Sequence, residues 1–206
     1  MSKYRGPRVR LIRSLGKLPT LTFKKPSRKK QKKTPGQHAK PLYIVLKKKS
    51  AYGLRLLEKQ KLRFNYNINE RQLVRYVKEA KRQNGPTGEI LLILLEMRLD
   101  NILCRLGFAP TISAARQLIN HGHILINQKK VTIPSYECQL KDVISVKKNK
   151  KSQQLIKATL EKRKYIPGHL SCDRKTLTGR INRKVNRNGV RLMINELLVV
   201  EYYSRN

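Results

Sequence analysis

Planar hydrogen-bond donors recur at helical spacing between residues 97 and 121. Arg98, Asn101 and Arg105 lie three and four positions apart, so an α-helix would place them on one side. Guanidinium groups can meet phosphates and base edges with two parallel hydrogen bonds, which a lysine ammonium cannot do. Further donors from a second helix and the turn after it are Ser113, Arg116, Gln117, His121, Lys129 and Lys130. The pattern predicts an exposed set of rigid donors that grips a nucleic-acid backbone.

The sequence contains no comparable pattern of residues for catalysis or metal binding. The acids outside residues 83–128 are scattered, and no Gly-rich phosphate loop, metal-ligand cluster or Ser/His/Asp arrangement occurs. Cys104, Cys138 and Cys172 are widely spaced without a CxxC pair, which argues against a disulfide framework and a zinc site. We therefore predict a non-enzymatic protein without cofactor or metal, whose thiols are buried or chemically indifferent.

Two short helices would position the donors. The first has an apolar side and ends at Gly107; that side consists of Leu99, Ile102, Leu103 and Leu106. Arg98, Asn101 and Arg105 are expected on its opposite, outer side, and we interpret Asp100 as a structural acid that pairs with a neighbouring arginine.

The second helix begins with Thr111 or Ser113 as its cap and ends near residues 120–122. Its inward side consists of Ile112, Ala115, Leu118 and Ile119, while Arg116 and Asn120 share its outer side. His121 at the helix end could be a capping donor or a nucleic-acid contact.

Short strands follow these helices. Residues 123–127 and 131–133 are expected to pair across a turn at 127–130, and residues 142–146 form a third candidate strand. The fold class is therefore α+β: a mostly helical N-terminal part with a basic extended arm, and a small module of two helices and antiparallel strands.

Charge is distributed unevenly around this module. The chain has 48 Lys and Arg against 12 Asp and Glu, a net charge of +36, yet residues 83–128 contain no lysine and balance three arginines with three acids. Residues 1–57 hold 18 basic residues and no acid, including the Lys- and Pro-rich tract at 24–40. Such a charge indicates a polyanionic partner, with nucleic acid the leading candidate. A basic, acid-poor transit peptide is the alternative explanation of the N-terminal segment.

A membrane span is not expected, because the longest apolar run, Ile90–Leu95, has only six residues. Before that run, Asn69 and Gln72 form a capping-box pattern ahead of a helix. Its apolar stripe is Leu73, Val74, Val77 and Ala80, and its other side is Arg71, Arg75, Lys78 and Arg82. This helix belongs to the helical N-terminal part.

These residues carry a family resemblance. Residues 97–136, MRLDNILCRLGFAPTISAARQLINHGHILINQKKVTIPSY, resemble the RNA-binding module named after small-subunit ribosomal protein four, which also occurs in RNA enzymes. The flanks resemble the ribosomal protein family itself, in the order SKYRGPRVRLIRSLG, TPGQH, LLEKQKLRF, ERQLVRYVKEA, TGEILLILLEMRLDN and, at the end, INELLVVEYYSRN. The resemblance covers nearly the whole chain.

Two departures from the family pattern qualify the resemblance. Residues 1–57 contain no cysteine, so the zinc knuckle of some bacterial members is not carried over. Gln128 stands where the hairpin turn of the family usually has glycine, which leaves the turn type open. The closing VVEYYSR is most similar to the plastid form. Since the resemblance begins at residue 2, we expect no cleavable presequence and a location in the chloroplast, with a bacterial or cyanobacterial cytoplasm as the alternative.

The resemblance implies a structural constituent of the small ribosomal subunit, present once per subunit and not as a homo-oligomer. It would bind the 5′ domain of small-subunit rRNA, nucleate assembly of the subunit body and, with small-subunit proteins five and twelve, contribute to translational accuracy. The C-terminal segment would pack back on the helical part, with Tyr202 and Tyr203 as packing groups. The expected division is a basic arm (1–49), a helical domain (50–96, joined by 190–206), the RNA-binding module with a basic tail (97–164) and a connecting segment (165–189).

The flanks add rRNA contacts to those of the module. The predicted contacts are Arg5, Arg8, Arg10, Arg13, Lys32, Lys33, Gln37 and His38 in the arm, and Lys59, Lys61 and Arg63 in the helical part. An RNA-modifying enzyme with the same module would need a separate catalytic domain, which the basic flanks do not supply. A ribosome-associated rescue or stress factor is the remaining alternative.

Overall fold

The computed structural model describes residues 4, 6–22, 24–27, 33–36, 40–41, 44, 50–161 and 165–204. The chain divides into two compact units. Unit 1 comprises Met1–Leu91 and Leu192–Asn206, and unit 2 comprises Leu92–Arg191. The two ends of the chain therefore belong to one unit.

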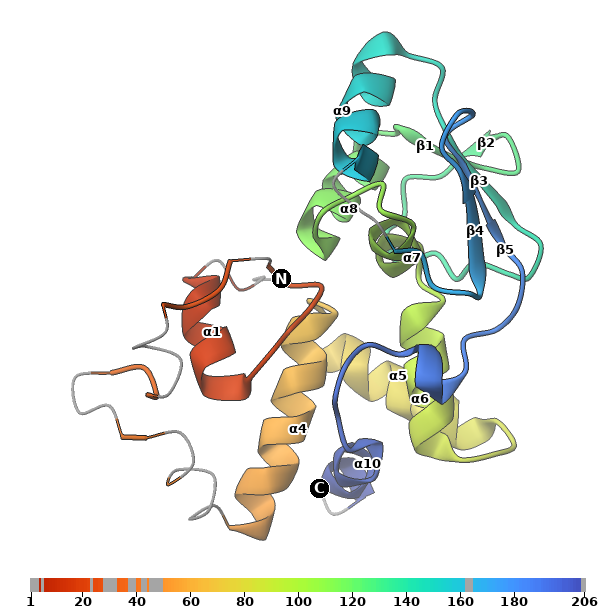
Figure 1. Cartoon of the computed structure of the whole chain (residues 1–206). Coiled ribbons are helices and arrows are strands. Elements are labelled where there is room, and N and C mark those ends of the chain that lie inside the picture. Colours follow the sequence, from red (N-terminus) through yellow and green to blue (C-terminus); the bar gives the residue numbers. More distant parts are fainter. Residues whose placement is uncertain are drawn as a thin grey trace. The chain divides into compact units, whose positions relative to one another are not determined.

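Unit 1 is helical in its described part. Its helices are α1 (Arg8–Leu15), α4 (Ala51–Asn65), α5 (Glu70–Arg82) and α10 (Glu196–Ser204), and α6 (Thr87–Glu96) begins in it and ends in unit 2. Helix α10 packs along α4 and also touches α5 (Figure 1). The prediction that the C-terminal segment returns to the helical part is confirmed. No helix among the described residues is long and apolar enough to cross a membrane.

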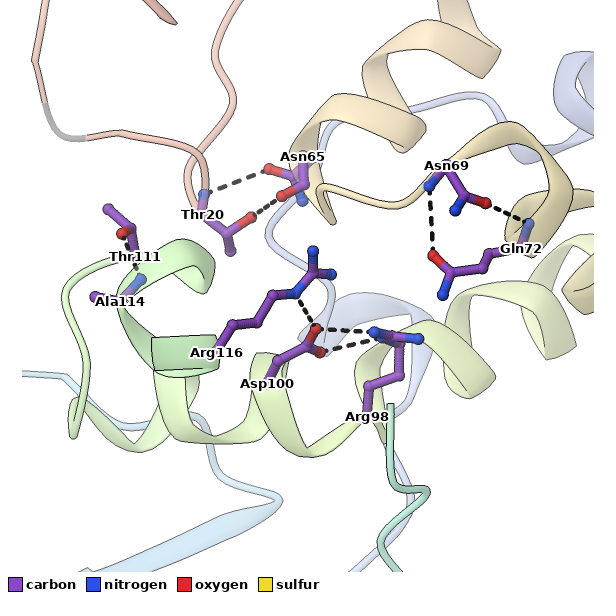
Figure 2. Close-up of polar contacts among 9 residues, drawn as sticks. All are labelled: Thr20, Asn65, Asn69, Gln72, Arg98, Asp100, Thr111, Ala114 and Arg116. Carbon is purple, nitrogen blue, oxygen red and sulfur yellow. Dashed lines mark hydrogen bonds and ion pairs between the residues drawn. The ribbon is translucent and has the colours of Figure 1, made fainter. Parts of the chain in front are cut away.

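Helix α5 forms as its sequence pattern predicts. The side chain of Asn69 accepts a hydrogen bond from the backbone of Gln72, whose own side chain accepts one from the backbone of Asn69, so the capping box is complete (Figure 2). Leu73, Val77 and Ala80 are buried on one side of the helix. The amphipathic pattern therefore fixes which side of α5 faces the core of unit 1.

Unit 2 contains the two predicted short helices. These are α7 (Leu99–Leu106), which ends at Gly107 with φ +90°, and α8 (Ile112–Asn120). The hydroxyl of Thr111 accepts a hydrogen bond from the backbone of Ala114 and caps α8 (Figure 2). Thr111 is thus the cap of the two candidates, and His121 is the C-terminal cap residue.

A five-stranded antiparallel sheet completes unit 2, in the order β2-β1-β3-β5-β4. Its strands are β1 (Ile124–Ile126), β2 (Lys129–Lys130), β3 (Val143–Val146), β4 (Leu170–Asp173) and β5 (Thr178–Ile181). The inner face is apolar, because Ile124, Ile126 and Ile144 are buried. Gly179 lets α7 pack closely against β5, since a Cβ there would lie 2.5 Å from a methyl carbon of Leu106.

The hairpin of β1 and β2 is shorter than predicted. Residues 131–133 are not a strand, and the turn is the pair Asn127–Gln128 rather than 127–130. Both turn residues have positive φ, +48° and +69°, which is the geometry of a type I′ turn and matches the twist of the strands. Gln128 therefore adopts the left-handed conformation that glycine usually supplies.

The segment 165–189, which was expected to be a connecting segment, contains two strands of the sheet. It contains the hairpin of β4 and β5, which extends the sheet through the pairing of β5 with β3. Helix α9 (Lys150–Glu161) occupies the basic tail of the module. None of these three elements was predicted, and the two strands are only four residues long and carry polar residues.

Candidate nucleic-acid interface

Asp100 lies at the centre of a buried ion-pair cluster in unit 2. Arg98 donates from Nε to Oδ1 at 3.1 Å and from Nη2 to Oδ2 at 2.8 Å, and Arg116 donates from Nε to Oδ2 at 2.7 Å (Figure 2). The carboxylate is 1% exposed. A buried carboxylate between two guanidiniums compensates charges that the interior could not hold alone. The interpretation of Asp100 as a structural acid is confirmed.

A second buried cluster surrounds Glu96. Arg105 donates from Nε to Oε2 of Glu96 at 2.9 Å and from Nη2 to its Oε1, and the amide of Asn101 donates to the Glu96 backbone oxygen at 3.1 Å. The side chains of Arg105 and Glu96 are 1% and 0% exposed. Burial lowers the pKa of the nearby His169 imidazole, and the positive charges of Arg105 and Arg183 add to this against the opposing effect of Glu96. The cluster joins the end of α6 to α7.

Helix α7 has no solvent-exposed side, contrary to the prediction. Arg98, Asn101 and Arg105 were expected on an exposed side, and this was wrong, because the N-cap residue Arg98 is 3% exposed and every residue of α7 is buried. The helix packs against α8 and the sheet, and an enclosed helix has no solvent face. The acids Glu96 and Asp100 make this burial possible by neutralising the guanidiniums.

Arg116 was also expected on an outer side, and it is only 7% exposed. Its guanidinium turns toward Asp100, one helix away, while its neighbour Asn120 is exposed as predicted. Arg116 therefore links α8 to α7 and holds the two helices of the module together. The four buried donors therefore hold the module together from its interior.

The donors that do reach the surface of unit 2 gather at the end of α8 and the following hairpin. Gln117, His121, Lys129 and Lys130 are exposed, and Ser113 is half-buried. Lys130 reaches the end of α8, because a Cβ at Gly122 would lie 2.2 Å from its Cε. Cations are favoured at a helix C-terminus, where the backbone carbonyls carry partial negative charge. The helix end and the hairpin thus form one basic surface.

The three predicted cations of α4 are engaged within unit 1. Lys59 is 5% exposed, and its Nζ donates to Oε1 of Glu70 at 3.0 Å. Lys61 pairs with Glu58, and Arg63 lies 3.8 Å from Glu70. An exposed contact by Lys59 was therefore a wrong expectation, since the acids of this part lie within its reach.

Glu70 also binds the C-terminal helix. The hydroxyl of Tyr203 donates to its Oε1, and Tyr202 packs edge-on against Tyr203 with ring centroids 5.2 Å apart. Burial would raise the pKa of Glu70, but hydrogen bonds from Tyr203 and Lys59 and the charges of Lys59 and Arg63 outweigh it and hold that pKa below its ordinary value. The interpretation of both tyrosines as packing groups is confirmed.

The N-terminal donors are partly described. Arg8 and Arg13 donate to the backbone oxygens of Leu21 and Thr34 at 3.2 and 2.9 Å, so both help to fold the segment around α1. Arg10 and Lys33 are exposed. Four predicted contacts lie outside the described residues: Arg5, Lys32, Gln37 and His38.

One exposed basic surface was missing from the predicted contacts. The outer side of α5 carries Arg71, Arg75, Lys78 and Arg82, all exposed, and these residues line a shallow groove together with Val74 and Glu79. The capping box and apolar stripe already assigned these residues to the outer side of a helix. Their spacing was the signal that could have added them to the contact surface.

The remaining polar groups of the described residues do not indicate catalysis or metal binding. Among the described residues, no group of three or more His, Cys, Asp or Glu side chains could hold a metal ion. Cys104 and Cys138 are buried, the Cys104 thiol lies 3.9 Å from the backbone oxygen of Pro110, and burial raises the pKa of the Cys138 thiol, which keeps it protonated and unreactive. The exposed cations and amides described above can bind anions.

Comparison with known proteins identifies the family. The model of the ribosomal protein S4/S9 N-terminal domain matches residues 3–96, and that of the S4 domain matches residues 97–144. The chain is 62% identical over 208 residues to small ribosomal subunit protein uS4c of Tupiella akineta, with 100% of both chains covered. The chain belongs to the uS4 family.

Other uS4 relatives cover the chain equally well. It is 57% identical to uS4c of Oltmannsiellopsis viridis, with 100% of both chains covered, and 56% identical to uS4 of Thermosynechococcus vestitus, with 100% of this chain and 99% of the relative covered. Both plastid and cyanobacterial uS4 proteins are therefore similar to it over their full length. The predictions of the family, of its plastid type and of a non-enzymatic ribosomal protein are confirmed.

Proposed function

We propose that this chain is a structural constituent of the chloroplast small ribosomal subunit that binds small-subunit rRNA directly. The observation that carries the proposal is the full-length similarity to small ribosomal subunit proteins, 62% identical in one case. The net charge of +36 supports it, because a free compact chain with that charge repels itself and a polyanion relieves the repulsion.

In this proposal the exposed donors and the buried donors of unit 2 have different roles. Folded RNA is recognised by shape and by phosphate and 2′-hydroxyl contacts more than by a base code. The exposed Gln117, His121, Lys129 and Lys130, with Ser113 beside them, bind that backbone directly. The buried donors Arg98, Asn101, Arg105 and Arg116 hold α7, α8 and the end of α6 in the geometry that presents this surface.

The N-terminal segment extends the contact. Arg10 and Lys33 offer exposed charges, and Arg5, Lys32, Gln37 and His38 belong to the same acid-free stretch of 57 residues. Arg8 and Arg13 belong to this stretch as well, and each binds a backbone oxygen of the same segment. Lys61 and Arg63 are partly exposed at 22% and 33% and contribute at the edge of α4.

The finer function follows the family resemblance. The chain binds where helices of the rRNA 5′ domain join, early in assembly, and nucleates the body of the subunit. Its contacts with small-subunit proteins five and twelve contribute to translational accuracy. It is present once per small subunit.

Quantification across a sucrose gradient of native, salt-washed ribosomes tests the ribosomal role. The expected result is one copy per small subunit that resists the wash. A substoichiometric protein that washes off would contradict the proposal and favour a ribosome-associated rescue or stress factor.

Direct RNA binding is tested with the full chain and a transcript of the 5′ domain of small-subunit rRNA. Each phosphate contact contributes roughly 0.7 to 0.9 to the log–log dependence of affinity on salt, so many contacts give a steep slope. A nearly salt-independent affinity would contradict backbone recognition.

A further inference from the structure

The outer side of α5 carries cations that the proposed function does not use. This α5 face consists of Arg71, Arg75, Lys78 and Arg82, which follow one another at intervals of four, three and four residues. Residues at such intervals lie on one side of a helix. The α5 face is therefore a single basic stripe, about 16 Å long at a rise of ~1.5 Å per residue, on a helix of 13 residues.

No carboxylate forms an ion pair with this stripe in the part of the chain that the structure describes. The ion pairs of unit 1 there use Arg55, Lys59, Lys61 and Arg63, and none involves the α5 face. Glu79 lines the same groove, but it forms no ion pair with the stripe either. The four charges thus remain available to an external anion.

The stripe opposes the stability of its own helix. Like charges three and four residues apart repel one another on a helix surface. The capping box and the buried Leu73, Val77 and Ala80 hold α5 together in spite of this repulsion. A row of phosphates would convert the repulsion into attraction, and the release of counterions from the nucleic acid would favour the complex.

We propose that the α5 face is a further rRNA-binding surface, which takes the sugar–phosphate backbone of one segment of small-subunit rRNA. This inference rests on the proposed function and adds a site to it. Three of the four groups are guanidiniums, which suit phosphate oxygens. An acidic protein segment is the other class of partner; RNA is favoured because the whole chain carries a net charge of +36.

The test compares the full wild-type chain with two variants that each lose four charges. The α5 variant carries Arg71→Gln, Arg75→Gln, Lys78→Gln and Arg82→Gln. The matched control carries Lys175→Gln, Arg180→Gln, Arg183→Gln and Lys184→Gln, which are exposed residues of unit 2. Each is titrated against the 5′-domain transcript at several salt concentrations, and the RNA backbone is footprinted with hydroxyl radicals.

The α5 variant is expected to lower the log–log salt slope by about three and to weaken binding on the order of a hundredfold near ~0.15 M salt. Its footprint should lose one protected backbone segment and keep the others. The control should keep every protected segment. A charge-retaining variant with Arg71→Lys, Arg75→Lys and Arg82→Lys should keep most of the slope. Circular dichroism should show that the α5 variant melts no lower than the wild type.

Three outcomes would overturn the inference while rRNA binding itself stands. The α5 variant could bind with an unchanged slope and a complete footprint. Both variants could lose equal affinity without a local change in the footprint, which would mean that net charge alone acts. The α5 variant could bind RNA normally but fail to enter the subunit, which would indicate an acidic protein partner. Failure of the wild-type chain to bind the transcript would refute the proposed function instead.

Discussion

The α5 face and the arginines at α7 and α8 are both basic, yet they differ in burial and in ion pairing. Arg98, Arg105 and Arg116 are buried and paired with acids, whereas the four charges of the α5 face are exposed and form no ion pair among the described residues. The difference arises from the acids within reach. A nearby carboxylate lets a guanidinium enter the core, and the lack of one keeps it at the surface.

The zero formal charge of segment 83–128 has a structural origin. Its three arginines balance three acids, and two of those acids, Glu96 and Asp100, lie inside with the arginines. Charge neutrality in this segment therefore reflects a polar core that fastens α6, α7 and α8 together. The uncompensated positive charge of the chain lies in the flanks of this segment.

Asp100→Ala should have the largest effect. It leaves Arg98 and Arg116 buried without their shared carboxylate, and breaking a buried pair in this way costs about 3–5 kcal/mol. Urea unfolding followed by far-UV circular dichroism would measure the loss, and Asp100→Asn separates charge from shape. A loss below ~1 kcal/mol would mean that water or another group compensates these guanidiniums.

Arg105→Met should cost about 3 kcal/mol, because Glu96 then keeps a buried charge without its partner. Adding Glu96→Gln to Arg105→Met should restore part of the stability, since the double variant holds no buried unpaired charge. Unfolding free energies of the two single variants and the double variant give the coupling. Additive losses would show that the pair does not act as a unit.

Glu70 offers an intermediate case, because it is 40% exposed and pairs with Lys59 and Arg63. Its pKa is lowered in the folded chain, so its stabilising contribution is present above the ordinary Glu pKa of roughly 4.3 and is lost as the pH falls through the lower folded value. Solvent screening keeps this contribution under ~1 kcal/mol. Melting temperatures between pH 3 and 6 should fall less steeply for Glu70→Gln; parallel curves would exclude this group as the cause.

Single neutralisations on the α5 face should have the smallest effect on stability. Arg75→Gln or Lys78→Gln should change the free energy of unfolding by less than ~0.5 kcal/mol, and by a slight gain if repulsion dominates. Thermal unfolding of the free chain measures this. A loss above ~1 kcal/mol would show that the side chain supports the fold and would remove the contrast with Arg105.

Local rules explain which parts of the fold were predictable. The capping box of Asn69 and Gln72, the glycine end of α7 and the cap of α8 depend on residues within four positions of one another; the first two form as predicted, and the third is Thr111, one of its two candidates. The hairpin turn was misplaced because Gln128 adopts a positive φ that its residue type does not signal. The strands β4 and β5 were missed because they join the sheet through the pairing of β5 with β3, more than thirty residues away.

The sequence by itself determined the α+β class, the capped helices and the excess of charge outside residues 83–128, since these follow from residue types at short spacing, and its resemblance over nearly the whole chain indicated the family. Only the tertiary structure decided which cations remain available. Arg98 and Arg105 carry the same donors as Arg71 and Arg75, and helical spacing alone assigns all of them to outer sides. Packing of α7 against α8 and the sheet brings Asp100 and Glu96 to the first pair, and that through-space compensation is invisible in a one-dimensional pattern.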